Sequence, residues 1–391
     1  MTQLLKPAAA TLFILSASIL SSFTNQVRPS TASTARPAFA PKIQAAILLD
    51  VSGSMDGLIE QAKAQLWNMV STMGRAKCDN EVSPQIEIAL YEYGRTTNDV
   101  KAGYVKKING FINDLDSLSQ NLFSLKTNGG DEYCGQVIYS SLQELQWDAS
   151  PQSYKVIFIA GNEDFLQGTL HYTKACTEAK NKGVIVNTIY CGDKMQGIRE
   201  HWNLAGECGN GSFTNINQDA REEEIPTPYD SLIYSMNDKL NNTYIAYGNG
   251  GRNYKAKQAQ MDAANANMSK TTGIKRISAK GNSAVYNNAQ WDLVDAKDKE
   301  GEAILEKIDK KELPDSLKNK TTAELKKIVE IKSKERSAVQ KQIAALNTQR
   351  DAYLASEKAK NATKNNAATL ETEVEKIIKL QAKRYNMVIG N

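Results

Sequence analysis

The sequence has very little histidine, with only His171 and His201 among 391 residues. Two histidines exclude a histidine-rich metal site. The G-x-x-x-x-G-K-[ST] phosphate loop, the H-E-x-x-H zinc motif and the G-x-S-x-G nucleophile motif are also missing. The 48 basic and 44 acidic residues nearly balance, giving a net charge of +4, so no nucleic acid and no anionic membrane is required as a partner. These absences indicate a binding or structural protein rather than an enzyme.

Cysteine is scarce and occurs only at positions 78, 134, 176, 191 and 208, with none in the last 183 residues. Five is an odd number, so at least one thiol stays unpaired or pairs outside the chain. The spacing does not fix the connectivity; we expect Cys191 to pair with Cys208, with Cys134 as a competitor. Neither histidine is placed to activate Cys134, so we interpret it as a paired or buried thiol rather than a nucleophile.

A single long apolar run lies near the N-terminus. Lys6 precedes apolar and small residues from Ala8 to Phe23, which is the pattern of a secretory signal peptide. The run is shorter than the ~20 strongly apolar residues of a membrane span. We predict a signal peptide over 1–25, a flexible linker over 26–41 and a secreted or periplasmic protein with no stable membrane span. An uncleaved membrane anchor is the less favoured alternative.

Apolar runs alternate with amphipathic stretches as far as Thr214. Strands are expected at 43–49, 86–93, 154–160 and 184–190, and helices at 58–73, 137–145 and 170–181. Because the apolar runs lack strict alternation, they indicate a mainly parallel sheet that is covered on both faces. The pattern predicts an α/β domain over 42–245 with a Rossmann-like, doubly wound sheet. Its ligands should bind at the carboxyl ends of the strands.

The first strand leads directly into Asp50-Val51-Ser52-Gly53-Ser54. One carboxylate and two hydroxyls in a turn can direct three oxygens at one point, and Mg²⁺ prefers oxygen ligands. Asp and Ser are also ordinary helix-capping residues, which is the alternative interpretation. Because the motif follows an apolar strand and precedes a long helix, we favour Asp50, Ser52 and Ser54 as metal ligands.

This motif and four other segments resemble the von Willebrand factor A (VWA) family. DVSGSM after IQAAILL is similar to its metal-ion-dependent adhesion site (MIDAS). The strings ALYEYG, TNGGDEYCGQVI, VIFIAGNEDF and VNTIYCGD, beginning at residues 89, 127, 156 and 186, resemble a bacterial exported branch with a helical C-terminal region. The resemblance covers 42–219 and implies a VWA sandwich that binds a partner without catalysing a reaction.

The resemblance also implies further ligands for the metal. The family's second loop places a threonine after a glycine pair, and here Gly129-Gly130 is followed by Asp131. Its third loop ends a strand with an aspartate, whereas here Gly161 or Asn162 takes that place, with Glu163 and Asp164 slightly beyond. We therefore expect Asp131 and Asp164 to join the site and Mg²⁺, or else Ca²⁺ or Mn²⁺, to be the cofactor. In the alternative interpretation, Asp131 and Glu132 only stabilise a helix N-terminus.

In this family a partner's carboxylate fills an open position on the metal. Three aspartates would already neutralise the cation, so a neutral or carbonyl-bearing ligand, or a purely structural clamp, is the alternative. The predicted function is a non-enzymatic binding module of the cell envelope or periplasm that recognises a protein or glycan. The loops expected to meet this partner contain Asn128, Gly129, Gly130, Glu132, Asn162 and Glu163.

The second half of the chain reads as helical. Residues 229–244 are expected to form the last helix of the sandwich, 246–312 a mixed junction and 313–391 an antiparallel helical hairpin with a polar linker at 361–368. A capping box at Thr321–Glu324 begins the long helix, whose weak heptad is interrupted by Lys332, Arg336 and Arg350. In the alternative function, this arm assembles a structural scaffold by self-association and the metal site is vestigial.

Overall fold

The computed structural model describes residues 41–78, 82–220, 224–360 and 369–390. The predicted signal peptide at 1–25, nearly all of the linker that follows it and the polar linker at 361–368 lie outside the described residues. No helix within the described ranges has both the length and the apolar character needed to cross a membrane.

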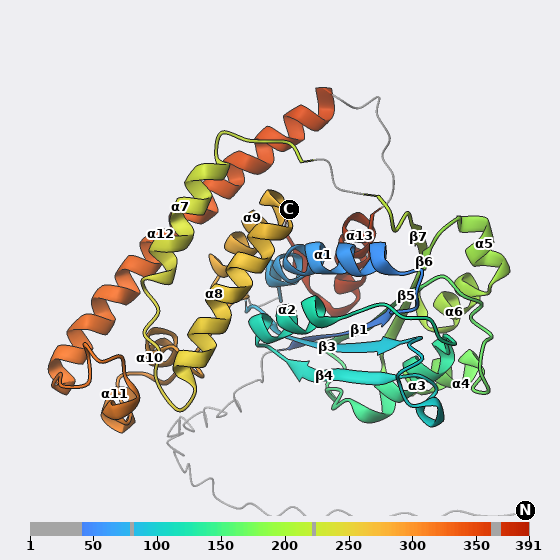
Figure 1. Ribbon diagram of the computed structural model, residues 1–391, viewed down its shortest axis with the longest axis horizontal. Helices are drawn as coiled ribbons and strands as arrows, with labels where there is room; N and C mark the ends of the chain where they lie inside the picture. Colours follow the sequence, from blue (N-terminus) through green and yellow to red (C-terminus); the bar gives the residue numbers. More distant parts are fainter. Residues whose placement is uncertain (1–40, 79–81, 221–223, 361–368, 391) are drawn as a thin grey trace, which may run out of the picture. The chain divides into compact units, whose positions relative to one another are not determined.

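A six-stranded sheet forms the centre of the fold (Figure 1). Its order is β4 (Lys106–Ile112), β3 (Gln85–Tyr93), β1 (Lys42–Asp50), β5 (Tyr154–Gly161), β6 (Ile185–Cys191) and β7 (Asn210–Ile216). All neighbouring strands are parallel except β4, which pairs antiparallel with β3. The predicted mainly parallel, doubly wound sheet is confirmed. Strand order reverses between β1 and β5, so their carboxyl ends form the crevice where such sheets bind ligands.

Helices cover both faces of the sheet, as the predominantly apolar central strands require. One face packs against α1 (Asp56–Gly74), α2 (Leu115–Ser124) and α13 (Leu370–Ala382). The other packs against α3 (Cys134–Glu144), α4 (Tyr172–Lys182) and α6 (Trp202–Cys208). A short helix, α5 (Lys194–Arg199), connects β6 with α6. Strands β5 and β6 are buried along their whole length.

The final helix, α13, belongs to the sheet's core. Its buried Gln381 accepts a hydrogen bond from the Tyr154 hydroxyl at 2.9 Å and donates one to Asn187 Oδ1 at 2.7 Å. Beyond α13, β8 (Val388–Ile389) pairs antiparallel with β2 (Ala76–Lys77). Helix α7 (Asp230–Asn241), which we expected as the last helix of the sandwich, contributes Ile233 and Leu240 to the same core but packs mainly on α12 and α9.

The remaining helices form the C-terminal helical region. They are α8 (Gly251–Met268), α9 (Lys270–Lys280), α10 (Leu293–Glu300), α11 (Ile304–Lys307) and the long α12 (Thr322–Lys360). The predicted capping box at the start of α12 is confirmed: Thr321 N donates to Glu324 Oε2 at 2.8 Å, and Glu324 N donates to Thr321 Oγ1 at 3.2 Å.

Two arginines explain how α12 packs. Arg336 is buried and donates to Asp292 and Asp295 at 2.6 and 2.5 Å, while Arg350 donates to Asp230 at 3.0 Å. A buried guanidinium needs such partners, so these interruptions of the apolar stripe attach α12 to α7 and α10. Direct α12–α13 pairing, as expected for a simple hairpin, is therefore not the main packing of either helix.

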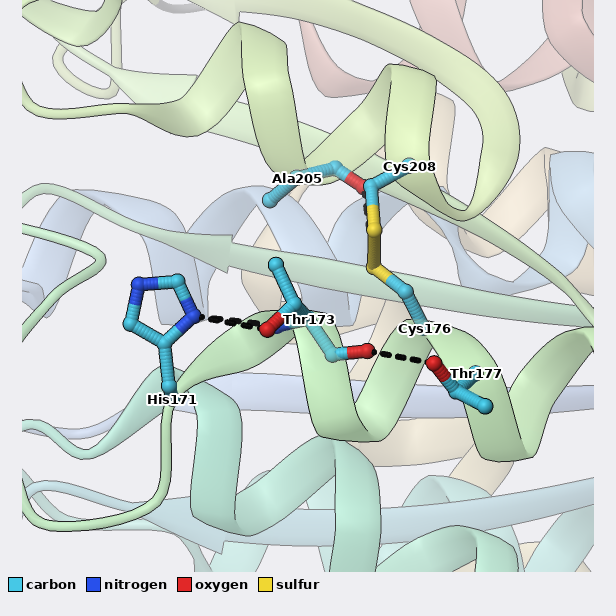
Figure 2. Close-up of a disulfide and its surroundings, with 6 residues drawn as sticks. All are labelled: His171, Thr173, Cys176, Thr177, Ala205 and Cys208. Carbon is cyan, nitrogen blue, oxygen red and sulfur yellow. Dashed lines mark hydrogen bonds between the residues drawn. A yellow bond between two sulfur atoms is a disulfide. The ribbon is translucent and has the colours of Figure 1, made fainter.

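The disulfide joins Cys176 of α4 to Cys208 of α6, with the two Cα atoms 5.7 Å apart (Figure 2). Our expected pairing of Cys191 with Cys208 is wrong. Cys191 is the last residue of β6 and is buried as a thiol, whereas α4 and α6 pack together over the same face of the sheet. Cys134, the expected competitor, is likewise a buried thiol, at the start of α3.

Candidate functional site

Three loops meet at the carboxyl ends of β1 and β5. The loop after β1 is joined to the loop after β5 because Asn162 Nδ2 donates to Ser54 Oγ at 3.3 Å. It is joined to the segment before α3 because Asn128 N donates to Val51 O at 2.9 Å. The predicted ligand Ser54 is exposed at this meeting point. These hydrogen bonds tie the three loops to one another.

Asp50 lies at the bottom of this site with no exposed surface. Its Oδ1 accepts a hydrogen bond from Ser52 N at 2.7 Å. The pKa of the Asp50 carboxyl is raised to about 6, mainly by burial and also by the nearby Glu163 carboxylate, against the lowering effect of hydrogen bonds from Ser52 and Asn162. Placing this carboxylate in a dry site favours its protonated form unless a cation compensates.

Glu132 is the second carboxylate of the site and is only 7% exposed. Its position beside Asp50 is visible at Gly94, where an added Cβ would lie 2.9 Å from Asp50 Oδ1 and also 2.9 Å from Glu132 Cγ. Burial raises the pKa of Glu132 to about 8, followed by repulsion from Asp50 and Glu163. Gly94 also has φ +83°, a conformation that glycine adopts without strain.

Several buried oxygens at this point have no hydrogen-bond partner among the described residues. They are Asp50 Oδ2, Ser52 Oγ and Asn162 Oδ1. Buried polar atoms are normally satisfied, because leaving one unpaired costs roughly 1–3 kcal/mol. All three are oxygens that can donate a lone pair, which is the chemistry that Mg²⁺ and Ca²⁺ select.

The two other expected ligands point elsewhere. Asp131 is exposed, and its carboxylate accepts a hydrogen bond from the Tyr133 hydroxyl at 3.3 Å. Asp164 accepts from Leu166 N at 3.0 Å and contacts His201 Nδ1 at 3.2 Å. The structure does not bring either aspartate to Asp50. In both loops the adjacent acid, Glu132 or Glu163, is the one that faces the site.

The residues of the expected partner-binding loops differ in how exposed they are. Asn128 and Gly129 are exposed, Gly130, Asn162 and Glu163 are half-buried, and Glu132 is buried inside the site. Gly130 is required by close approach, since a Cβ there would lie 2.6 Å from Gly94 O. The sequence contains both acidic pairs but not the direction of each side chain, which depends on loop contacts.

Two residues, Trp202 and Gln167, hold the third loop in place. The fully buried Trp202 donates from Nε1 to Glu163 O at 2.7 Å. Gln167 accepts from Glu132 N at 3.2 Å and donates to Glu163 Oε2 at 3.3 Å. Gln167 thus bridges the second and third loops and keeps Glu163 near Glu132. Sequence reasoning missed this bridging residue, since a lone glutamine in a loop carries no motif.

Gly161 occupies the place where the family ends a strand with an aspartate. An added Cβ there would lie 2.5 Å from the Tyr93 hydroxyl and 3.0 Å from Asp50 Oδ2. The Tyr93 hydroxyl therefore occupies the space that a side chain at position 161 would need. The Tyr93 hydroxyl donates to Ala160 O at 3.0 Å and lies 3.8 Å from Cys134 Sγ. Burial raises the pKa of the Cys134 thiol well above its usual range, which does not suit a nucleophile.

Carboxylates alone do not make a metal centre here. Within the described ranges, no group of three or more His, Cys, Asp and Glu side chains could hold a metal ion. A cation at Asp50 would therefore depend on hydroxyl and amide oxygens in addition to the carboxylates.

No protein-family model and no curated protein matches this chain. Among solved structures, proximal thread matrix protein 1 from the mussel byssus is 14% identical over 46% of this chain and 43% of its own, with a TM-score of 0.33. A von Willebrand factor type A protein from Catenulispora acidiphila is 13% identical over 46% and 39%, with a TM-score of 0.34. The pilus adhesin SpaC from Lactobacillus rhamnosus GG is 12% identical over 46% and 28%, with a TM-score of 0.34.

This chain spans less than half the length of these three proteins. One structure of the mussel protein is described with a zinc-occupied MIDAS motif. The sheet order, the single antiparallel edge strand and the two helical layers define a VWA-like fold with a C-terminal helical region. The fold implied by the sequence resemblance is thus confirmed.

Proposed function

We propose that this protein is a non-enzymatic binding module whose loops after β1 and β5 hold a divalent cation for partner recognition. The observation that carries the proposal is the set of buried, unpartnered oxygens of Asp50, Ser52 and Asn162 beside Glu132. A cation would coordinate buried oxygens that have no hydrogen-bond partner at normal distance and angle, and it would relieve the repulsion between the two buried carboxylates.

Asp50, Ser52, Ser54 and Glu132 would hold the ion. Mg²⁺ fits a site with few protein oxygens because it retains several waters, and Ca²⁺ or Mn²⁺ would be accepted through the same oxygens. When bound, the ion supplies a coordination position that an oxygen of a protein or glycan partner fills in place of a water. The protein's own groups orient the loops: Asn162 holds Ser54, and Gln167 holds Glu132 near Glu163.

The proposed location is the periplasm or the outside of the cell. The N-terminal sequence carries the pattern of a signal peptide. The Cys176–Cys208 disulfide adds support, because such bonds persist in oxidising compartments.

The test is calorimetric titration of Mg²⁺, Mn²⁺ and Ca²⁺ into the full chain and into three variants. Asp50→Ala and Glu132→Gln should each weaken binding at least about tenfold, since each removes a charged ligand. Asp131→Asn is the matched control, because it neutralises the exposed neighbouring acid, and its affinity should stay within about threefold. Binding lost in Asp131→Asn but kept in Glu132→Gln would reverse the ligand assignment. No binding by the unaltered chain would refute the metal site.

A second candidate function is a structural scaffold that self-associates through the helical region. The exposed Ile331 on α12 and Leu380 on α13, 55% and 58% exposed, favour it. Sedimentation of the full chain at increasing concentration tests this candidate, and an Ile331→Ser variant that dissociates an observed oligomer would support it.

A further inference from the structure

The candidate cation site contains more negative charge than one divalent ion needs. Asp50 and Glu132 face it directly, and Glu163 acts electrostatically on both carboxylates. The contacts of Gln167 to Glu132 N and to Glu163 Oε2, at 3.2 and 3.3 Å, keep that third acid beside the site. Asp131 adds a fourth negative charge on the exposed side of Glu132.

These four acids are not paired with basic side chains among the described residues. Arg95, which follows Gly94, is paired with Glu92 at 3.5 Å, and His201 contacts Asp164. A divalent ion held by Asp50 and Glu132 would therefore be neutralised, and Glu163 and Asp131 would leave the surrounding loops negative. The unpartnered Asp50 Oδ2 and Ser52 Oγ, on residues 0% and 4% exposed, independently place the cation position within these acids.

An open coordination position on the ion is filled by a partner atom that donates a lone pair. For a cation that prefers oxygen, this atom is either a carboxylate oxygen or a neutral oxygen. A partner carboxylate would approach a neutralised ion inside a negative surround, with Coulomb repulsion and no net charge to attract it. A hydroxyl or amide carbonyl oxygen suffers no such repulsion. We propose that the partner group completing this site is a neutral oxygen donor, a glycan hydroxyl pair or a peptide carbonyl, and not a carboxylate. This inference rests on the proposed cation site.

The experiment uses the full chain loaded with Mn²⁺, whose unpaired electrons broaden the NMR signals of molecules that bind next to it. Enhanced relaxation of water first reports that Mn²⁺ is bound, and Asp50→Ala with the same total Mn²⁺ gives the background. The probes, at equal concentration, are acetate, methyl α-mannoside and N-methylacetamide. We expect at least one neutral probe to be broadened about tenfold more than acetate. The two neutral probes distinguish a glycan-type from a peptide-type ligand.

A charge variant tests the cause. Glu163→Gln should increase acetate broadening several-fold, because it removes one uncompensated charge from the site. Glu207→Gln is the matched control, since it makes the same charge change on exposed surface of α6 and should leave acetate unchanged. Acetate broadened as strongly as the neutral probes in the unaltered protein would overturn the inference while leaving the cation site intact. If water relaxation shows no bound Mn²⁺, the proposed function and this inference both fail.

Discussion

The stability of the metal-free protein should fall as pH rises from 5 to 8. Burial and the neighbouring acids raise the pKa of Glu132 from 4.5 to about 8. The folded protein thus holds a proton that the unfolded chain releases above pH 4.5. This contribution to stability is fully present below pH 4.5 and is lost as the pH rises through 8. At about 1.4 kcal/mol per pH unit, the loss between pH 5 and 8 is roughly 3–4 kcal/mol.

Asp50 acts in the same direction at lower pH. Its pKa is raised from 3.8 to about 6, so its contribution is lost between these two values. Because the Asp50 carboxylate contributes to the raised pKa of Glu132, the two losses are not independent, and we take roughly 5 kcal/mol as their combined upper limit. That is a large fraction of the stability of an ordinary domain, about 5–15 kcal/mol.

The assay is urea unfolding in the presence of a chelator at pH 5, 6.5 and 8, followed by circular dichroism. The midpoint should decrease with pH in the unaltered chain, and excess Mg²⁺ at pH 8 should recover it, because a bound cation stabilises the ionised form. Glu132→Gln should remove most of the pH dependence, whereas Asp131→Asn should retain it. A midpoint that rises with pH, or an equal slope in Glu132→Gln, would refute the reasoning.

Three further changes test the site and the core by urea unfolding. Gly94→Ala should lower the free energy of unfolding by about 2 kcal/mol and abolish cation binding, because the residue has φ +83° and its Cβ would overlap Asp50 and Glu132. The control is Gly129→Ala, whose Cβ would have nothing within 4 Å and which should have little effect on unfolding. Arg336→Met should cost about 3–5 kcal/mol, since it strands two buried carboxylates; a neutral result would show that these acids are protonated at no cost. Ile378→Ser, at a fully buried position, should lower the free energy of unfolding by about 3 kcal/mol. Leu380→Ser, at a position 58% exposed on the same helix, should change it by no more than about 0.5 kcal/mol. Equal effects of the two variants would argue against the packing of α13.

Sequence patterns predicted the central strands and missed the edges for a physical reason. Strands β1, β5 and β6 are buried on both faces and therefore appear as apolar runs. Strands β4, KKINGFI, and β7, NGSFTNI, are mostly half-buried, so polar residues are tolerated and no run forms. Their pairing depends on neighbours far along the chain, which a local pattern does not report.

In the candidate site, too, the residues of a contiguous motif were predictable and those that depend on distant contacts were not. Asp50 and Ser52 were predictable because they follow a recognisable strand within a contiguous motif, and both are buried at the meeting of the loops. Asp131 and Glu132 are neighbours whose side chains point in different directions. Those directions depend on the hydrogen bond between Gln167 and Glu132 N and on the backbone of Gly94, which lies close to Glu132. Neither determinant is adjacent in sequence, so spacing alone could not tell which of the two acids is buried inside the site.

The C-terminal region also has to be interpreted through its buried contacts. Leu370, Val374, Ile377 and Ile378 of α13 belong to the same core as the apolar side chains of α1 and β1. Each such side chain stabilises the fold by roughly 1.5–3 kcal/mol when buried. Together these contributions are comparable to the whole stability of a domain. Helix α13 therefore covers part of one face of the sheet. We expect its removal to destabilise the sheet domain as well as the helical region.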